Sequence, residues 1–374
     1  MSKQIVIIGA GFAGLWSALS AKRLLKHRNE EDKIKVLVIA PEPYLARIVH
    51  VQPSSSSKPV TPIGYDRLIL AAGSSINRPK TVAGLREFAF DVDSLDSATQ
   101  LEEHLNGLAS LSESPARNTV VVCGGGFTGI ELAAELPNRL LGHIANSRVI
   151  LVESADEIGP ELGPGPRPAI TQAMNELGIQ VKTGAAVSSV SAKGVTLTSG
   201  EHIESMTAIW TAGVVATPLA QQINGPKDSF GRLHVDQYLR TPSTEHVFAT
   251  GDAARALADS EGHYALMSCQ HALQLGRVSG HNAAADLLGE PMLEYSQETY
   301  ACCLDLGLSG AVIGRGWGRE VGVTGQRAKR VKEHINRNLI YPPSDASQAL
   351  DLADPVGPDA DELPLLEHIL EVVG

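Results

Sequence analysis

Two glycine-rich loops with the same spacing constrain this chain more than any other feature of its sequence. Each loop has the pattern G-x-G-x-x-G, between an apolar run and a stretch with helical spacing. The first glycine permits a tight turn, the second lets the backbone approach a pyrophosphate, and the third lets the helix pack close to the strand. The duplication therefore predicts two dinucleotide sites, whose glycines are Gly9, Gly11 and Gly14 in the first loop and Gly124, Gly126 and Gly129 in the second.

The residues around both loops predict the same structural unit twice. A helix is expected over residues 12–27 after the first loop and over residues 127–141 after the second. Each helix lies between two short apolar runs that are typical of buried parallel strands, at 5–8, 36–39, 119–122 and 149–152. We therefore expect an α/β fold with two Rossmann-like, doubly wound domains, the second inserted in the first.

The residue that ends the second strand of each unit distinguishes the two loops. After the second loop this residue is Glu153, whose carboxylate would accept hydrogen bonds from a ribose 2′-hydroxyl and repel a 2′-phosphate. No arginine follows nearby, so the sequence predicts NADH rather than NADPH. After the first loop the same place holds Ala40. Glu42, two residues later, is either the ribose ligand or a solvated loop carboxylate.

The composition excludes several classes of function. The chain has 374 residues and a formal net charge of -11, which argues against nucleic acid as its partner. Its four cysteines form no C-x-x-C pair, and we see no secretory signal, so we expect reduced thiols in the cytoplasm. No apolar run approaches the roughly 18 residues of a membrane-spanning helix. No set of metal ligands or catalytic triad stands out.

Four motifs in this order resemble those of flavoprotein reductases with two dinucleotide-binding domains. They are GAGFAG, YDRLILAAGS at 65–74, GGGFTGIELAAEL, and VFATGDAA at 247–254. The resemblance covers roughly residues 1–290 and implies FAD at the first loop and NADH at the second. It further implies that Ala72 and Gly73 mark the crossover between domains. Gly251 and Asp252 would reach the ribityl or phosphate region of the flavin.

Within that group the chain resembles the type II NADH dehydrogenases. Disulfide reductases of this fold carry a redox cysteine pair near the flavin, and this sequence has none. The stretch SCQHALQLG, residues 268–276, is similar to the A-Q-x-A-x-Q segment whose glutamines line the quinone pocket, with Cys269 in place of the first alanine. Gln270 and Gln274 share one helix face. They either hydrogen-bond a quinone carbonyl or are surface or interdomain glutamines.

The resemblance implies a flavoprotein oxidoreductase that passes hydride from NADH to FAD and electrons on to a quinone or another small acceptor. It also places Glu131 near the nicotinamide. Two alternatives stay open: an NADH-dependent reductase of a small redox protein, and a non-catalytic nucleotide-binding or redox-sensing protein with an impaired flavin site. We expect a cytoplasmic protein, and leave open both a peripheral contact with the inner face of the cell membrane and a homodimer.

We predict that the FAD-binding domain comprises residues 1–90 and 230–290, and the NADH-binding domain residues 91–229. Residues 45–65 are far fewer than the family has between the second strand and the crossover motif. The flavin domain is therefore either pared down or shortened by an internal deletion that impairs FAD binding.

Residues 291–374 are expected to form a C-terminal segment with an acidic, proline-rich linker and a terminal helix over 363–373. The polar face of that helix carries Glu367 and Glu371 rather than basic residues, so it suits packing or dimer contacts as well as lipid. The basic stretch 325–337 is a better candidate for a lipid-headgroup face, although such stretches are usually solvated helices.

Overall fold

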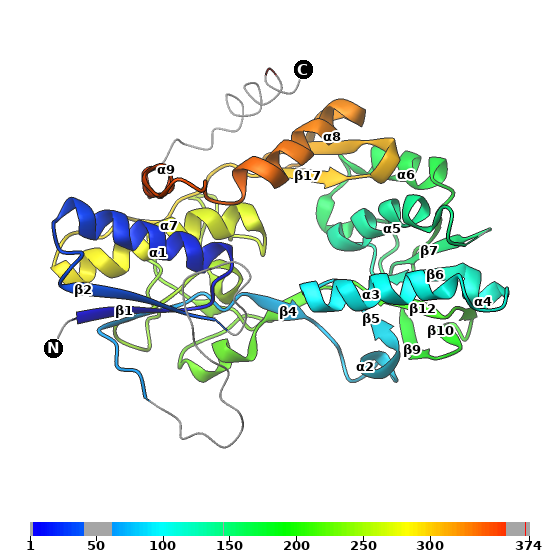
Figure 1. Cartoon of the computed structure of the whole chain (residues 1–374), viewed down its shortest axis with the longest axis horizontal. Helices are drawn as coiled ribbons and strands as arrows, with labels where there is room; N and C mark the ends of the chain where they lie inside the picture. The colour runs from blue at the N-terminus through cyan, green and yellow to red at the C-terminus, as the bar shows by residue number, and fades with distance from the viewer. Residues whose placement is uncertain (1–2, 41–61, 145, 357–370, 372–374) are drawn as a thin grey trace. The chain divides into compact units, whose positions relative to one another are not determined.

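The computed structural model describes residues 3–40, 62–144, 146–356 and 371, and the chain falls into two compact units (Figure 1). The chain passes from unit 1 to unit 2 in strand β4 (Ser74–Ile76) and returns in β13 (Val214–Ala216). The second unit is therefore inserted in the first, as predicted. Of the described residues, unit 1 contains 3–40, 62–75, 215–298 and 335–356, and unit 2 contains 76–144, 146–214, 299–334 and 371.

Unit 1 is built on a four-stranded parallel sheet with the order β15-β3-β1-β2. Helices α1 and α7 lie side by side against this sheet (Figure 1). They approach closely because glycine lies between them: a Cβ at Gly280 would be 2.1 Å from the carbonyl oxygen of Ser17. The elements are β1 (Lys3–Ile8), α1 (Phe12–His27), β2 (Ile34–Ile39), β3 (Arg67–Leu70), β14 (Leu233–His234), β15 (Val247–Ala249), β16 (Ala254–Arg255), α7 (Cys269–Leu288) and α9 (Ala346–Asp351).

Unit 2 is built on a five-stranded parallel sheet with the order β5-β12-β6-β7-β8. Its central strand β6 (Thr119–Cys123) is buried along its whole length, which explains its uninterrupted apolar sequence. The other elements of this layer are α2 (Leu85–Phe88), β5 (Ala89–Phe90), α3 (Leu95–Leu108), α4 (Pro115–Asn118), α5 (Phe127–Leu140), β7 (Arg148–Val152), α6 (Arg167–Glu176), β8 (Gln180–Lys182) and β12 (Thr207–Trp210).

The described residues also form two three-stranded antiparallel sheets and several short helical turns. The first sheet has the order β11-β10-β9 and the second β17-β18-β19. Their strands, the helix that follows them and the turns used below are β9 (Val187–Ser191), β10 (Gly194–Leu197), β11 (His202–Glu204), β17 (Ala301–Asp305), β18 (Ala311–Arg315), β19 (Glu320–Thr324), α8 (Gly325–His334), η1 (Pro160–Leu162) and η3 (Gly251–Ala253).

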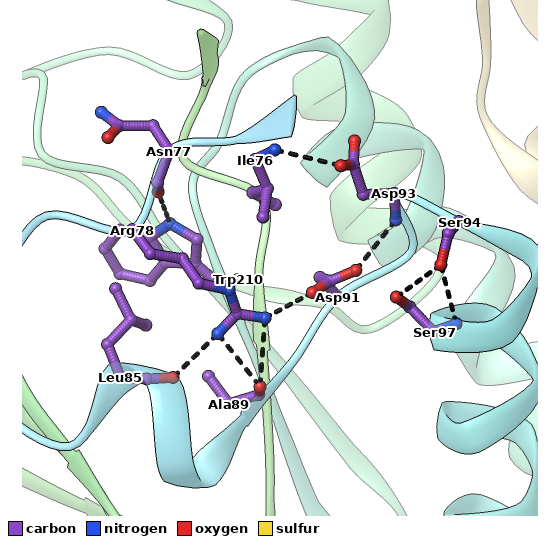
Figure 2. Close-up of polar contacts among 10 residues, drawn as sticks. All are labelled: Ile76, Asn77, Arg78, Leu85, Ala89, Asp91, Asp93, Ser94, Ser97 and Trp210. Atoms are coloured by element: carbon purple, nitrogen blue, oxygen red, sulfur yellow. Dashed lines mark hydrogen bonds and ion pairs between the residues drawn. The ribbon is translucent and has the colours of Figure 1, made fainter. Parts of the chain in front are cut away.

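The first residues of unit 2 are held by a network around Arg78 (Figure 2). The guanidinium donates to the carbonyl oxygen of Leu85 at 2.9 Å and pairs with the carboxylate of Asp91. Asp91 also accepts the main-chain N–H of Asp93 at 3.0 Å, and Asp93 in turn accepts that of Ile76. Both members of the ion pair are largely buried, so this network fixes the entry of the chain into unit 2.

The stretch that we expected to be a C-terminal segment divides between the two units. Residues 299–334 pack in unit 2, and the described residues 335–356 pack in unit 1. The proline-rich stretch differs from the linker that its composition predicts. Asp345 caps α9, and Asp354 pairs with Arg23 of α1 at 2.5 Å, so helix capping and an ion pair hold it to unit 1. The predicted terminal helix lies outside the described residues except for Glu371.

Candidate functional site

The first glycine loop joins β1 to α1 and leaves room for a ligand. A Cβ at Gly9 would lie 2.1 Å from the carbonyl oxygen of Ala71, and one at Gly14 would lie 2.0 Å from that of Gly9. A Cβ at Gly11 would meet no heavy atom of the described chain within 4 Å. The N-cap residue of α1 is Gly11, which has no side chain to accept the first N–H groups of the helix. The geometry fits the pyrophosphate of a dinucleotide.

The predicted crossover and Gly-Asp residues lie beside this loop. A Cβ at Gly9 would be 3.1 Å from the Cα of Ala72, and one at Gly251 would be 2.7 Å from the Cβ of Ala13 on α1. Asp252 accepts a hydrogen bond from the hydroxyl of Ser74 at 2.7 Å. Two stretches that are far apart in sequence therefore meet at the start of α1. Glu42 lies outside the described residues.

The second glycine loop repeats the construction of the first. A Cβ at Gly124 would lie 2.7 Å from the main-chain nitrogen of Ala212, and one at Gly129 would lie 1.7 Å from the carbonyl oxygen of Gly124. Glu153 follows β7 and is 7% exposed. Its carboxylate accepts the N–H of Gly125 at 2.7 Å. The predicted ribose ligand therefore lies directly against the loop.

The two loops differ at their second glycine. A Cβ at Gly126 would lie 2.5 Å from Oε1 of Glu161, and this oxygen accepts the N–H of Phe127 at 2.7 Å. Glu161 belongs to the turn η1, which follows the strand that ends before Glu153. Glu161 was not predicted, because it belongs to no motif and lies in an irregular connection.

Glu131 points from α5 toward α8 within unit 2. Its Oε1 is 2.9 Å from Nζ of Lys332 and also accepts the N–H of Asp305 at 2.9 Å. Burial raises the pKa of Glu131, and the nearby charge of Lys332 offsets part of that rise. Lys332 also lies over the ring of Phe127 at 5.2 Å. Lys332 was not predicted, because a pair so far apart in sequence leaves no local pattern.

A second lysine of α8 repeats this pairing one turn away. Lys329 bonds to Asp305 at 2.5 Å and to Glu135 at 3.2 Å. Burial alone would lower the pKa of Lys329, but its bond to Asp305 and the two carboxylate charges outweigh that and raise it. The basic stretch is therefore not uniformly solvated. Its two half-buried lysines hold α8 to α5, whereas Arg327 and Arg330 are exposed.

The two glutamines of the predicted quinone segment lie at the beginning of α7. Ser268 caps this helix, and its hydroxyl lies 2.9 Å from Nδ1 of His271. His271 is fully buried, as expected of a packing histidine. The amide of Gln274 donates to the carbonyl oxygen of Pro355 at 2.8 Å. Gln274 therefore contacts the stretch after α9, and a role for Gln270 and Gln274 in quinone binding stays a prediction.

Three of the four cysteines, Cys123, Cys302 and Cys303, are free, and Cys123 and Cys302 are buried. Burial raises the pKa of the Cys123 and Cys303 thiols to about 12 and that of Cys302 to about 11. Since the thiolate is the reactive form, these three side chains are poor nucleophiles at neutral pH. Cys269 is exposed.

The arrangement of two glycine loops, each in its own parallel sheet, agrees with a family comparison. Residues 44–276 match the model of the pyridine nucleotide-disulphide oxidoreductases. The chain belongs to this family. The family name refers to a disulphide, whereas this sequence contains no C-x-x-C pair.

The names of individual relatives refer to NADH dehydrogenases or NADH:quinone oxidoreductases. The chain is 39% identical to a NADH dehydrogenase-like protein of Mycobacterium tuberculosis over 386 residues, which cover 92% of this chain and 96% of the relative. It is 22% identical to a type II NADH:quinone oxidoreductase of Staphylococcus saprophyticus, over 91% of this chain and 95% of that protein. The structure of NDH2 from Plasmodium falciparum in complex with NADH has a similar fold, with a TM-score of 0.71, 13% identity and coverage of 94% and 97%.

The alignment with the mycobacterial relative is longer than the part of this chain that it covers. The aligned length of 386 residues exceeds the 374 residues of this chain, so the alignment must contain gaps in this chain. This agrees with a chain that lacks residues present in its relatives. The shortening was predicted at residues 45–65, of which 45–61 lie outside the described part of the structure.

Proposed function

We propose that this protein passes hydride from NADH to FAD and electrons on to a quinone-type acceptor. The observation that carries the proposal is the pair of glycine loops, each of which opens a helix from a parallel sheet in its own unit. The names of the mycobacterial and staphylococcal relatives support the same reaction.

Unit 1 is the proposed FAD-binding unit. Gly11 and the first N–H groups of α1 hold the pyrophosphate, while Gly9 and Gly14 allow the loop to fold tightly enough to present it. Asp252, oriented by the hydroxyl of Ser74, accepts hydrogen bonds from the ribityl or phosphate region. The bound flavin supplies the two-electron chemistry, and the protein supplies orientation and electrostatics.

Unit 2 is the proposed NADH-binding unit. The loop with Gly124, Gly126 and Gly129 and the start of α5 bind the pyrophosphate. Glu153 accepts hydrogen bonds from the ribose hydroxyls, and its charge repels the 2′-phosphate of NADPH. Glu131 lies one turn into α5 and acts toward the nicotinamide, with Lys332 fixing its carboxylate.

Gln270 and Gln274 are the proposed quinone ligands. Both offer amide N–H groups, which suit the carbonyl oxygens of a quinone. They stand on successive turns of α7, which packs on the helix that begins at the flavin loop. Electrons would leave the flavin on this side of unit 1.

We also propose that the protein makes peripheral contact with the inner face of the cell membrane. In the described residues no helix combines the length and the apolar character needed to cross a membrane. The exposed arginines of α8, Arg327 and Arg330, support contact with anionic headgroups. Co-sedimentation with anionic and neutral vesicles tests this proposal, and sedimentation without vesicles tests the proposed homodimer.

Steady-state turnover tests the proposed reaction. Protein reconstituted with FAD should oxidise NADH with a soluble quinone, and kcat/KM should be lower for NADPH because of Glu153. Turnover with a small redox protein but with no quinone would contradict the proposed acceptor. A protein that retains no flavin after reconstitution would contradict the catalytic function.

A further inference from the structure

The second glycine loop contains a carboxylate of the chain itself at the position of its proposed ligand. Oε1 of Glu161 accepts the N–H of Phe127, the first residue of α5, at 2.7 Å. The Cβ that Gly126 lacks would lie 2.5 Å from the same oxygen. At Gly11, the matching glycine of the first loop, such a Cβ would meet no described heavy atom within 4 Å. The two loops share one backbone design but differ in this group.

The contact uses the chemistry of pyrophosphate binding. The second glycine of the motif allows close approach to a pyrophosphate, and the first N–H groups of the helix bind its oxygens. A carboxylate oxygen offers the same negative charge and acceptor to those N–H groups. The first turn of α5 has no acidic residue of its own, so Glu161 provides that charge from η1. Since like charges repel at contact distance, Glu161 and a pyrophosphate cannot both occupy this place.

The side chain of Glu161 can leave without movement of the backbone around it. The turn is anchored by Leu162, which is 2% exposed, and by the N–H of Gly159, which donates to the carbonyl oxygen of Gly125 at 2.9 Å. Glu161 itself is exposed. Rotation about its side-chain bonds is therefore enough to uncover the N–H of Phe127.

We propose that Glu161 is an internal competitor of the dinucleotide, whose carboxylate occupies the pyrophosphate position and sets the affinity of unit 2 for NADH. The inference rests on the proposed NADH site. Glu161 would weaken the binding of NADH, whereas the other residues proposed for this site strengthen it. A carboxylate at a helix N-terminus contributes an interaction that changes a binding constant about two- to fivefold. Removal of its charge should tighten binding by that factor.

Calorimetric titration of the FAD-loaded full-length protein with ADP-ribose tests the proposal. This probe contains the pyrophosphate and the adenosine ribose but no nicotinamide, so its affinity reports on the contacts of the loop and of Glu153 without those of the nicotinamide. The Glu161→Gln variant should bind ADP-ribose about two- to fivefold more tightly than the unmodified protein. Glu157→Gln is the matched control: Glu157 lies in the same connection, is exposed, and pairs with Arg167 at 2.7 Å instead of α5. The affinity of Glu157→Gln for ADP-ribose should equal that of the unmodified protein.

The outcomes separate this inference from the proposed function. The difference between Glu161→Gln and the unmodified protein should shrink as ionic strength rises, because salt screens the competing charge. Unchanged or weaker binding of ADP-ribose by Glu161→Gln, while the unmodified protein binds it, would overturn the inference and leave the NADH site intact. If neither protein binds ADP-ribose or NADH, the proposed NADH site would be overturned as well.

Discussion

The carboxylate of Glu131 lies 2.9 Å from the ammonium group of Lys332, although 200 residues separate the two in the chain. Glu131 stands on the helix that the second glycine loop opens, and Lys332 stands on α8. Burial raises the pKa of the Glu131 carboxyl, and the charge of Lys332 offsets part of that rise. A helix from the C-terminal part of the chain thereby orients a proposed catalytic residue.

Replacement of Glu131 by Gln should lower turnover with NADH while FAD content stays unchanged. The substitution preserves shape but removes the charge that Lys332 orients. Hydrogen bonds that involve a charged group contribute about 1.5–3 kcal/mol, so we expect a decrease in kcat of about tenfold or more. Flavin content should not change, because Glu131 lies in unit 2.

Glu135→Gln is the control for this experiment, since Glu135 lies one turn further along α5 and pairs with Lys329 instead. Its turnover should resemble that of the unmodified protein. An unchanged kcat in Glu131→Gln would contradict a role for this residue at the nicotinamide.

Replacement of Glu153 by Ala should reduce the preference for NADH over NADPH. The carboxylate is 7% exposed and is fixed by the N–H of Gly125 at 2.7 Å, so its charge acts at a defined place. Loss of a charged hydrogen bond to the ribose should weaken NADH binding about tenfold or more. The ratio of kcat/KM for the two nucleotides measures the effect. A ratio equal to that of the unmodified protein would show that Glu153 does not select the nucleotide.

The ion pair at the entry to unit 2 should matter for stability. In Asp91→Asn the guanidinium of Arg78 loses its charged partner in a place where both side chains are at most 16% exposed. We expect the free energy of unfolding to fall by about 1–3 kcal/mol. The pair of Arg139 with Glu102 is a control, because both side chains are more than half exposed. Glu102→Gln should change stability by no more than about 0.5 kcal/mol, measured by chemical denaturation.

Acid sensitivity should depend in part on His281 of α7. Burial lowers the pKa of His281, and the charge of Arg23 lowers it further. Below the ordinary pKa of 6.5 the unfolded chain therefore binds a proton that the folded protein does not, and stability falls as the pH drops from 7.5 to 5.5. His281→Gln should reduce this loss by at most about 1.4 kcal/mol per pH unit. If Tm falls by the same amount between pH 7.5 and 5.5 in His281→Gln and in the unmodified protein, this role of His281 would be contradicted.

The parts of the fold that could be predicted are those with local patterns. Both strand–loop–helix units are confirmed, because an apolar strand, a glycine turn and an amphipathic helix each leave a short-range signal. The helix expected over 127–141 ends at Leu140. A single-residue difference of this kind arises at helix ends, where the backbone bonds are weakest.

The interactions that could not be predicted join distant parts of the chain. The return of residues 299–334 to unit 2 depends on short antiparallel strands and on Lys329 and Lys332, whose partners lie in α5. Glu161 could not be predicted for a different reason: a glutamate in a turn has no distinctive spacing. The packing of α9 on unit 1 could not be predicted, because the proline and acidic residues of this stretch are also typical of linkers.

Anaerobic spectroscopy of the FAD-loaded protein tests the central claim most directly. Addition of NADH should bleach the visible absorption of the flavin, and subsequent addition of a soluble quinone should restore it. Both steps are required, because the first reports hydride transfer from NADH and the second reports electron transfer to the proposed acceptor. A flavin that stays oxidised with NADH, or one that stays reduced with quinone, would contradict the account.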